Sequence, residues 1–403
     1  MQTSAVKEPP AAISLRSALR FVVLLGVISL LADMTYEGAR SIAGPYLAVL
    51  GASAAAVGFV AGLGELMGYA LGLASGYLSD RTQRYWTITL VGYVVNLLAV
   101  PLLALAGHWP VAAALIVLER LGKGIRTPAR DAMLSHATQQ MGRGWGFGLH
   151  EAMDQTGAIL GPLIVTAVLY WNGSYRVGFA VLLIPALLAL GVLVAAWSLY
   201  PRPQELEVHP PNIETAGLPR AYWRYLIAAS LVAAGYANFS LIGYHFEKTA
   251  AVADTWIPIL YAVAMGTDAL AALMLGALFD RIGIPVLAAV TSISALFVPL
   301  VFGAGFYPAL LGMALWGIGM GAQESIMRAA VAAMTPVHRR GAAYGIFNTG
   351  YGLAWFAGSA LMGLLYDQSV SYVILFSVIA QLAAIPLFLH LGRQGVREAT
   401  GHG

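Results

Sequence analysis

The residues of this sequence that could carry chemistry are charged and polar side chains inside long apolar runs. Burial disfavours an ionised carboxylate and a nearby cation favours it, so an acid in such a place can load and release a proton near neutral pH. Water cannot solvate side chains that lie this deep in a membrane. We predict a proton-coupling or substrate cavity lined by Asp33, Glu37, Arg40, Arg120, Lys123, His150, Asp154, Asp268, Glu324 and Asn348.

Asp154 is the acid that we expect to bind and release the coupled proton. It lies at mid-depth of an apolar run, one helical turn after His150. Arg120 lies too deep in its own run to extend easily to the membrane interface, so a carboxylate must face it or water must reach it. We expect Arg120 to be the electrostatic partner of Asp154 or of Asp33.

Other polar residues in the runs allow two interpretations. Glu324, one turn before Arg328, is either a protonation site or half of a structural salt bridge. Asn348 either lines the cavity or hydrogen-bonds to a neighbouring helix. Arg126 and Arg130, near the end of their run, are expected to snorkel to the membrane interface.

The segments that hold these side chains are long and apolar. Of 403 residues, 59% are hydrophobic and 10% are charged, whereas a soluble domain has about 25% charged residues. A helix needs about 20 apolar residues to cross a hydrocarbon layer ~30 Å thick. We expect an all-α integral membrane protein with twelve transmembrane helices at 18–38, 54–78, 86–107, 110–131, 144–170, 175–198, 222–244, 256–279, 284–305, 307–331, 340–366 and 370–391.

The same sequence argues against several other classes of protein. A transmembrane barrel would show segments of about ten alternating residues, and the first run lacks the small-residue cleavage site of a signal peptide. Basic residues flank the apolar runs rather than forming one patch, so no nucleic acid is expected as a partner. The chain has no cysteine, no phosphate-binding loop, no histidine spacing typical of a metal site and no hydrolase arrangement. We therefore expect no cofactor, no metal and no enzymatic activity.

Lys and Arg predict the orientation, because they concentrate in the cytoplasmic loops of membrane proteins. If the N-terminus is cytoplasmic, most of the 22 Lys and Arg residues fall on the inner side, and Arg40, Arg176 and Lys248 fall outside. We expect both termini to be cytoplasmic.

A polar, proline-rich stretch at 199–221 is typical of an interdomain linker. The segments on its two sides, 1–198 and 222–403, resemble each other: Gly-Tyr-Leu-Ser-Asp-Arg at 76–81 recurs as Gly-Ala-Leu-Phe-Asp-Arg at 276–281. We expect two pseudo-symmetric six-helix bundles in parallel orientation. Secondary transporters use such repeats to build alternating access around a site near the membrane midplane.

Residues 76–84 fit the pattern G-x-L-x-D-R-x-x-R, in the loop between the second and third runs. With this motif and its copy, the chain resembles a twelve-helix transporter of the major facilitator superfamily, drug/proton-antiporter-like, over essentially its full length. The resemblance implies a latch that holds the two halves together when the protein is open to the outside. The latch residues would be Gly76, Asp80, Arg81, Arg84, Asp131, Asp280 and Arg281.

The resemblance implies a more specific role for three of these residues. Gly76 would let two helices approach closely. Asp80 would lie near the N-terminus of the eleventh helix, whose dipole favours a carboxylate. Arg84 would pair with Asp131 at the inner end of the fourth helix.

The fourth and fifth runs carry weaker family patterns. Arg120 followed by Gly124 resembles R-x-x-x-G, whose arginine is implicated in proton coupling in this superfamily. Gly157, Gly161 and Pro162 match the core of G-x-x-x-G-P, which is associated with antiporters. The small residues would allow close helix crossing, and the proline would kink or weaken the helix. Apolar residues follow where the longer family pattern has paired glycines.

We predict a monomeric secondary active transporter in the inner membrane of a bacterium, embedded in the lipid bilayer. It would move a small organic solute by proton-coupled export. The alternative is a proton symporter or facilitator that imports a nutrient or small organic acid, which Arg120 and Lys123 could attract. A membrane receptor without transport activity is a further alternative.

Overall fold

The computed structural model of the chain describes residues 15–138, 143–201, 217–303, 305–335 and 340–400. Every regular element in these ranges is helical, and they contain no strand. The expectation of an all-α protein is therefore confirmed. Most of the expected linker, residues 202–216, lies outside the described residues.

The helices before the linker form the first group. They are α1 (Leu15–Val49), α2 (Ala54–Thr82), α3 (Tyr85–Leu102), the 3-10 turn η1 (Leu103–Leu105), α4 (Trp109–Thr138), α5 (Arg143–Asn172), α6 (Tyr175–Val181) and α7 (Leu183–Leu199).

The helices after the linker form the second group. They are α8 (Arg220–Gly235), α9 (Phe239–Thr249), the 3-10 turn η3 (Asp254–Trp256), α10 (Ile257–Ile282), α11 (Pro285–Ser294), α12 (Phe297–Val301), α13 (Phe306–Gly321), the π-helical turn η4 (Ala322–Ile326), α14 (Met327–Met334), α15 (Arg340–Gln368) and α16 (Val370–Thr400).

Each expected apolar run coincides with a helix or with consecutive helices. Within the described residues, eight helical segments are long and apolar enough to cross a membrane by themselves. The segment of α11 and α12 is shorter, and α4 carries several charges in its middle. A membrane protein with many spans is therefore supported, whereas the count of twelve remains a prediction.

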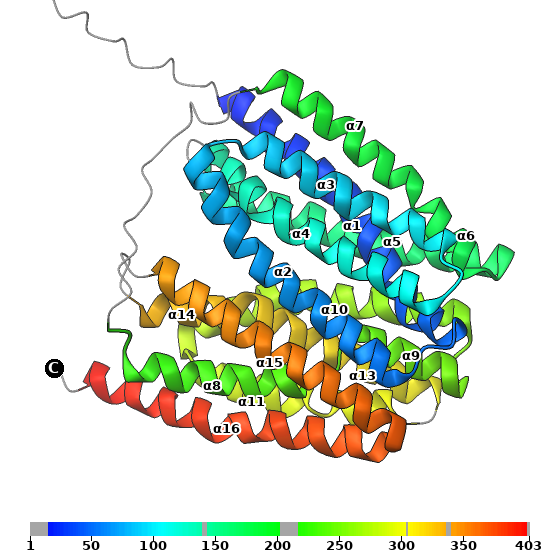
Figure 1. Cartoon of the computed structure of the whole chain (residues 1–403). Coiled ribbons are helices and arrows are strands. Elements are labelled where there is room, and N and C mark those ends of the chain that lie inside the picture. Colours follow the sequence, from blue (N-terminus) through cyan, green and yellow to red (C-terminus); the bar gives the residue numbers. More distant parts are fainter. Residues whose placement is uncertain (1–14, 139–142, 202–216, 304, 336–339, 401–403) are drawn as a thin grey trace, which may run out of the picture.

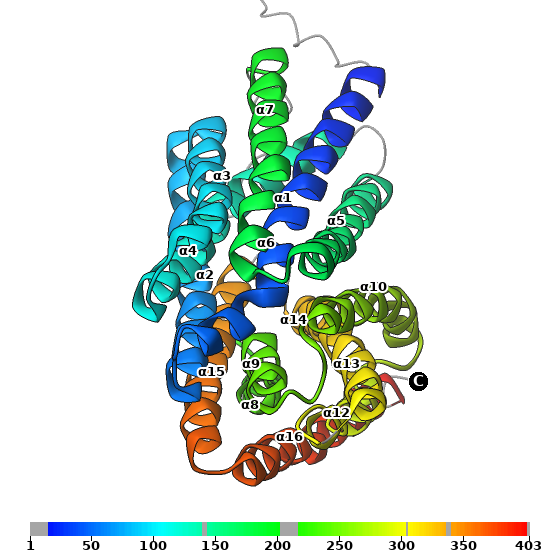
Figure 2. The ribbon, with the colours of Figure 1, turned by 90° about the vertical axis from the view of Figure 1, so that its right-hand side faces the viewer.

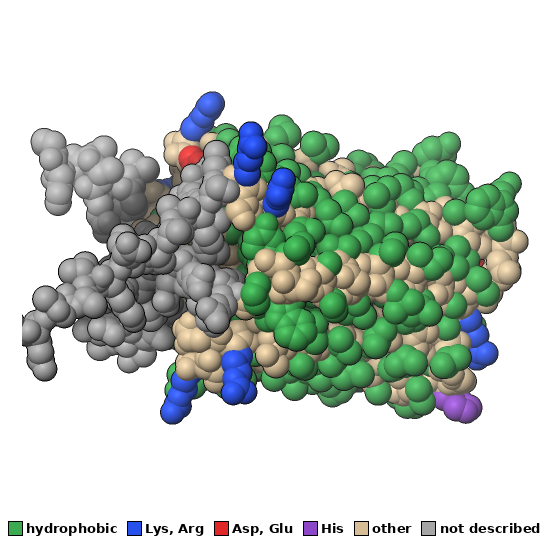
Figure 3. Space-filling view, turned by 90° about the horizontal axis from the view of Figure 1, so that it is seen from above, with side chains coloured by type: hydrophobic (Ala, Val, Ile, Leu, Met, Phe, Trp, Pro, Cys, Tyr) green, Lys and Arg blue, Asp and Glu red, His purple; other side chains and the backbone are tan. Residues whose placement is uncertain are grey.

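The two groups lie side by side and diverge towards one end (Figures 1 and 2). They meet mainly where α2 lies along α15, α1 along α9 and α5 along α10. We call the end at which α1 begins, α7 ends and α8 begins the linker end, and the opposite end the far end. Figure 3 shows a broad belt of hydrophobic side chains with Lys and Arg near its margins, as a protein surface inside a bilayer requires.

Close contacts between helices depend on glycine. Gly157 of α5 lies against the backbone carbonyl of Leu30 in α1, and Gly161 lies against that of Met34. A Cβ atom at either glycine would overlap with α1, so α5 could not cross it as closely. The helix continues unbroken through Pro162.

Candidate functional site

Six charged side chains from three helices of the first group form one largely buried cluster, which we call the charge network. Its members are Glu37 and Arg40 of α1, Glu65 of α2, and Glu119, Arg120 and Lys123 of α4. Residues three apart on a helix face the same side, which is why Glu37 and Arg40 of α1, and Arg120 and Lys123 of α4, lie close together.

Glu65 is the residue at which α1, α2 and α4 meet. Its Oε1 atom lies 2.8 Å from Nη2 of Arg40 and 3.5 Å from Nη2 of Arg120. The arginine side chains are only 18% and 10% exposed. A buried guanidinium needs an acidic partner, and here one carboxylate serves two.

The other two acids complete the network. Oε1 of Glu37 lies 3.5 Å from Nη1 of Arg40 and 3.8 Å from Nζ of Lys123. Glu119 lies 3.4 Å from Nε of Arg120 and accepts a 2.7 Å hydrogen bond from Nδ2 of Asn96 on α3. Three acids thus face three bases, and the formal charges balance.

Glycines bring α4 close enough to its neighbours to build this network. A Cβ atom on Gly64 of α2 would lie 2.9 Å from Cγ of Arg120, and one on Gly122 of α4 would lie 2.8 Å from Cβ of Asn96. Larger residues would push α4 away from α2 and α3 and lengthen the ion pairs.

A cavity of about 30 Å³ lies beside the charge network. Arg40, Glu65 and Arg120 line it from the first group, and Asn238 and Ser240 line it from the second. The space holds about two water molecules, whereas a drug-sized ligand needs about 300 Å³ or more. Water can therefore solvate the network, but an organic solute would need the helices to move.

Asp33 and Asp154 form a second acidic position between α1 and α5. Asp33 is 4% exposed, and Oδ1 of each acid has no hydrogen-bond partner among the described residues. A Cβ atom on Gly157, one turn after Asp154 on α5, would lie 3.0 Å from Cβ of Asp33. The structure thus brings these two predicted acids together.

The expected pairing of Arg120 with Asp154 or Asp33 is not made in this conformation, because Arg120 pairs with Glu65 and Glu119.

Arg126 and Arg130 do not snorkel to the interface, and that prediction is wrong. Arg126 is 1% exposed; its Nη1 donates a 3.1 Å hydrogen bond to the hydroxyl of Tyr93, whose ring centre lies 4.4 Å from the guanidinium. Arg130 donates to Ser29 at 2.9 Å and pairs with Asp131 at 2.8 Å. Inside the bundle, the hydroxyl and ring of Tyr93 contact Arg126, whose Nε has no hydrogen-bond partner among the described residues. Ser29 and Asp131 contact Arg130.

His150 contacts the same serine hydroxyl as Arg130. It is buried, and its Nε2 lies 3.2 Å from Oγ of Ser29, the hydroxyl that also accepts from Arg130. One turn of α5 separates His150 from Asp154, as the sequence predicts.

The predicted site residues of the second group lie on three helical segments. Asp268 of α10 is 2% exposed, and its Oδ1 has no hydrogen-bond partner among the described residues. Glu324 is exposed on the π-helical turn η4, and Asn348 is half-buried on α15. Single π-helical turns are rare and often mark functional sites.

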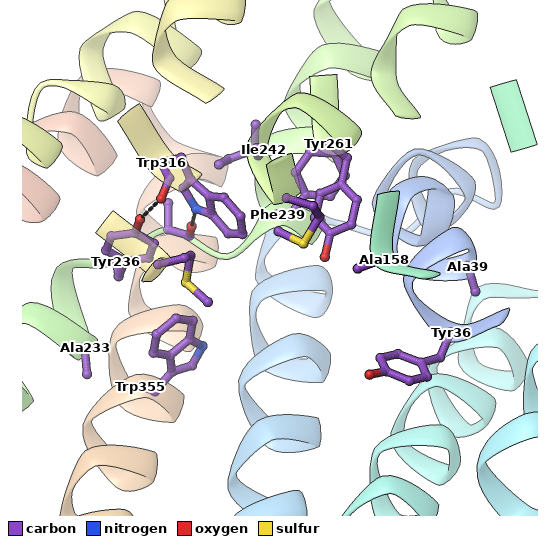
Figure 4. Packing of buried hydrophobic residues seen from close by; sticks show 14 of the residues in the cluster. Tyr36, Ala39, Ala158, Ala233, Tyr236, Phe239, Ile242, Tyr261, Trp316 and Trp355 are labelled. Carbon is purple, nitrogen blue, oxygen red and sulfur yellow. Dashed lines mark hydrogen bonds between the residues drawn. The ribbon is translucent and has the colours of Figure 1, made fainter. Parts of the chain in front are cut away.

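Aromatic side chains of the second group stand opposite the first. Figure 4 shows Phe239, Tyr261, Trp316 and Trp355 on one side and Tyr36 of α1 on the other. Tyr261 donates a 2.5 Å hydrogen bond to Oε2 of Glu37 and so joins the second group to the charge network.

The predicted latch residues lie at or near the linker end. A Cβ atom on Gly76 would lie 3.5 Å from the Pro128 side chain of α4. Asp131 pairs with Arg130, and within the described part of the chain no ion pair joins it to Arg84 in this conformation. The remaining predicted members are exposed at the ends of α2 and α10: Asp80, Arg81, Arg84, Asp280 and Arg281.

Several residues of the site carry no motif in the sequence. Glu119 could have been identified from the sequence, because it directly precedes Arg120 inside an apolar run. Glu65 is an acid near the middle of the second run, which by itself marks it as a candidate. Tyr261 and Asn96 resemble ordinary packing residues, and only their contacts with Glu37 and Glu119 reveal them.

A helical protein with an apolar belt, an interior charge network and buried acids between two groups of helices is arranged to pass a small solute through a membrane. Residues 25–268 and 226–401 match the model of the Major Facilitator Superfamily. The chain belongs to this superfamily, and it is a multi-pass membrane transporter. The superfamily inferred from the loop motif is therefore confirmed, whereas the twelve-helix and antiporter-like details remain predictions.

Two relatives match nearly the whole chain. An uncharacterized protein of Mycobacterium tuberculosis (strain ATCC 25618 / H37Rv) is 41% identical over 376 residues, which cover 92% of each chain. An uncharacterized MFS-type transporter of Methanocaldococcus jannaschii is 28% identical over 386 residues, covering 91% of this chain and 94% of that one. A crystal structure of a mutant of the nucleoside transporter NupG has a TM-score of 0.75 at 13% identity, covering 92% of this chain and 99% of that chain, and shows the same fold.

Proposed function

We propose that this transporter moves a small organic solute by alternating access, driven by protons, and that the solute leaves the cell. In this proposal the chain crosses the inner membrane of a bacterium twelve times, with both termini in the cytoplasm. The two groups of helices are the bundles that rock against each other.

The observation that carries the proposal is the position of the contacts between the two groups. The hydrogen bonds that join described residues of the two groups gather towards the far end, as between Tyr175 and Glu247 (2.6 Å) and between Tyr244 and Ala52 (3.1 Å). The groups diverge towards the linker end (Figure 1). With the linker end inside the cell, these contacts hold the outer ends of the two groups together, as one of the two states of alternating access requires.

Buried acids support coupling to protons. Asp33, Asp154 and Asp268 each have an Oδ1 atom without a hydrogen-bond partner in the described residues. A buried polar atom without a partner is costly. A bound proton or a cationic solute would remove that cost, so these acids can bind either one in alternation.

The direction of transport is proposed from a sequence pattern on α5. The Gly157, Gly161 and Pro162 pattern on α5 favours export. Import of a small organic acid is the second candidate, because Arg40 and Arg120 line the cavity and a solute carboxylate would compete with Glu65 for them.

The test starts with a thermal-shift screen of drugs, sugars, organic acids and metal chelates, since a bound ligand stabilises the folded protein by mass action. The ligand found is then used in proteoliposomes with an imposed pH gradient. Export by antiport predicts that the solute moves against the proton flow, and symport predicts that it moves with it. Binding without any solute movement would contradict transport and favour a receptor.

A further inference from the structure

At the far end, the second group of helices contacts the first through the start of a helix. Helix α2 begins at Ala54, directly after its N-cap residue Ser53. Asp367, in the last turn of α15, accepts two hydrogen bonds from it: Oδ1 from the backbone N–H of Ala54 at 3.0 Å and Oδ2 from that of Ala55 at 2.9 Å. A carboxylate of the second group therefore caps a helix of the first.

The capping of α2 is divided between the two groups. The first N–H groups of a helix have no partner within it, and they form the positive end of the helix dipole. Oγ of Ser53 accepts from the N–H of Ala56 at 3.1 Å. Because Ser53 belongs to α2 itself, this bond can persist in any arrangement of the groups. The two bonds to Asp367 can exist only while the far end is closed.

The charge of Asp367 has no ion-pair partner among the described residues. Hydrogen bonds from N–H groups to a charged carboxylate are stronger than those between neutral groups. Asp367 is exposed, so water can replace the two N–H groups when the helices separate. The cap therefore adds a limited preference for the closed far end, as a gate that must open in each cycle requires.

The packing beside the cap brings the two helices into backbone contact. Gly363 lies one turn before Asp367, and a Cβ atom there would stand 2.5 Å from the carbonyl oxygen of Ala54. On α2, Gly58 lies against the carbonyl of Ser359. The glycines allow the close approach, and Asp367 uses it to reach the helix start.

We propose that Asp367 is a gating residue of the transport cycle, whose carboxylate holds the far end closed by capping α2 and releases it when the far end opens. This assignment rests on the proposed function, because it places Asp367 in one state of alternating access. It adds a residue that no sequence motif marks.

The test measures distances between spin labels on introduced cysteines, and the chain has no cysteine of its own. Leu105→Cys with Tyr307→Cys reports on the far end, where both side chains are 80% exposed on opposite groups. Leu199→Cys with Ile282→Cys reports on the linker end. In Asp367→Asn, the amide keeps one acceptor oxygen but loses the second hydrogen bond and the negative charge, so the ratio of far-end-open to far-end-closed molecules should rise roughly fivefold. Linker-end distances should shorten in the same molecules.

Ser53→Ala is the matched control, because it removes a cap from the same helix start but not a contact between the groups. It should lower thermal stability and leave the ratio of open to closed molecules unchanged. Gly363→Ala, which inserts a methyl group between the backbones, is the reference for an opened far end.

Unchanged distance distributions in Asp367→Asn would overturn the proposal, and so would an equal shift in Ser53→Ala. The distances are measured without a solute. Unchanged far-end distances in Asp367→Asn would therefore contradict the role of Asp367, whereas absence of solute transport would contradict the proposed function.

Discussion

Tyr261 of α10 donates a 2.5 Å hydrogen bond to Oε2 of Glu37, while Oε1 of the same carboxylate lies 3.5 Å from Arg40 and 3.8 Å from Lys123. One carboxylate thus contacts the second group of helices through one oxygen and the cations of the first group through the other. A movement of α10 away from α1 would remove a donor from Glu37 and leave it to the two cations. The relative position of the groups is in this way linked to the electrostatics of the charge network.

Tyr261→Phe should loosen this link. A hydrogen bond to a charged group contributes about 1.5 kcal/mol, so we expect a loss of that order in the free energy of unfolding, together with longer far-end distances between spin labels. Tyr46→Phe is the control, since its hydroxyl donates to Leu103 and Ala106 within the first group. It should cost similar stability without changing the distances. Equal distance shifts in both variants would contradict the link.

Glu65→Gln should destabilise the charge network. The neutral amide leaves Arg40 and Arg120 without the carboxylate that they share. We expect a loss of about 2 kcal/mol, less than for a fully buried pair because water in the adjacent cavity can reach the arginines. Thermal unfolding in detergent measures it. Glu151→Gln, at an exposed acid on α5, should change the melting temperature little, and equal melting temperatures for the two variants would refute the shared role of Glu65.

Asp154→Asn should abolish solute accumulation driven by a pH gradient and spare solute exchange at equal pH. The amide keeps the shape of the side chain but cannot release a proton, and exchange needs no net proton movement. Proteoliposome flux measures both activities. Asp254→Asn, at an exposed carboxylate of η3, should retain both. Full gradient-driven transport by Asp154→Asn would transfer the coupling role to Asp33, Asp268 or Glu324.

Asp80→Asn and Arg84→Ala should each destabilise the state that is open at the far end, because the loop motif at 76–84 implies that these residues latch the linker end. Expression should remain largely intact, since both side chains are exposed. Distances between labels at Leu199→Cys and Ile282→Cys should lengthen. Distance distributions identical to those of the parent chain would count against the latch.

The helices of this protein could be predicted almost completely from its sequence. Apolar length decides whether a segment forms a helix in a membrane, and this property is local. The expected run 144–170 became α5 (Arg143–Asn172), and 54–78 became α2 (Ala54–Thr82). The run 18–38 is one exception, because α1 continues through Pro45 to Val49. The runs 222–244 and 284–305 are others, because each is divided into two helices.

The depth of some charges could also be predicted, although that of Arg126 and Arg130 was not, and their partners could not be predicted. Asp33, Asp154 and Arg120 are inside the protein, as their positions in apolar runs indicate. Depth along a helix follows from residue number, since each residue adds a fixed rise. The rotation and tilt of a helix against its neighbours depend on side-chain packing across the whole bundle.

By itself the sequence therefore determined a helical membrane protein of this superfamily and part of the set of acids and bases inside it. The tertiary structure alone decided that Arg120 pairs with Glu65 and Glu119 rather than with Asp154, and that Asp367 caps α2. Such pairs join residues that are far apart in the chain. They form only where glycine contacts such as those of Gly64 and Gly363 let the helices approach closely, and that geometry is a property of the packed bundle.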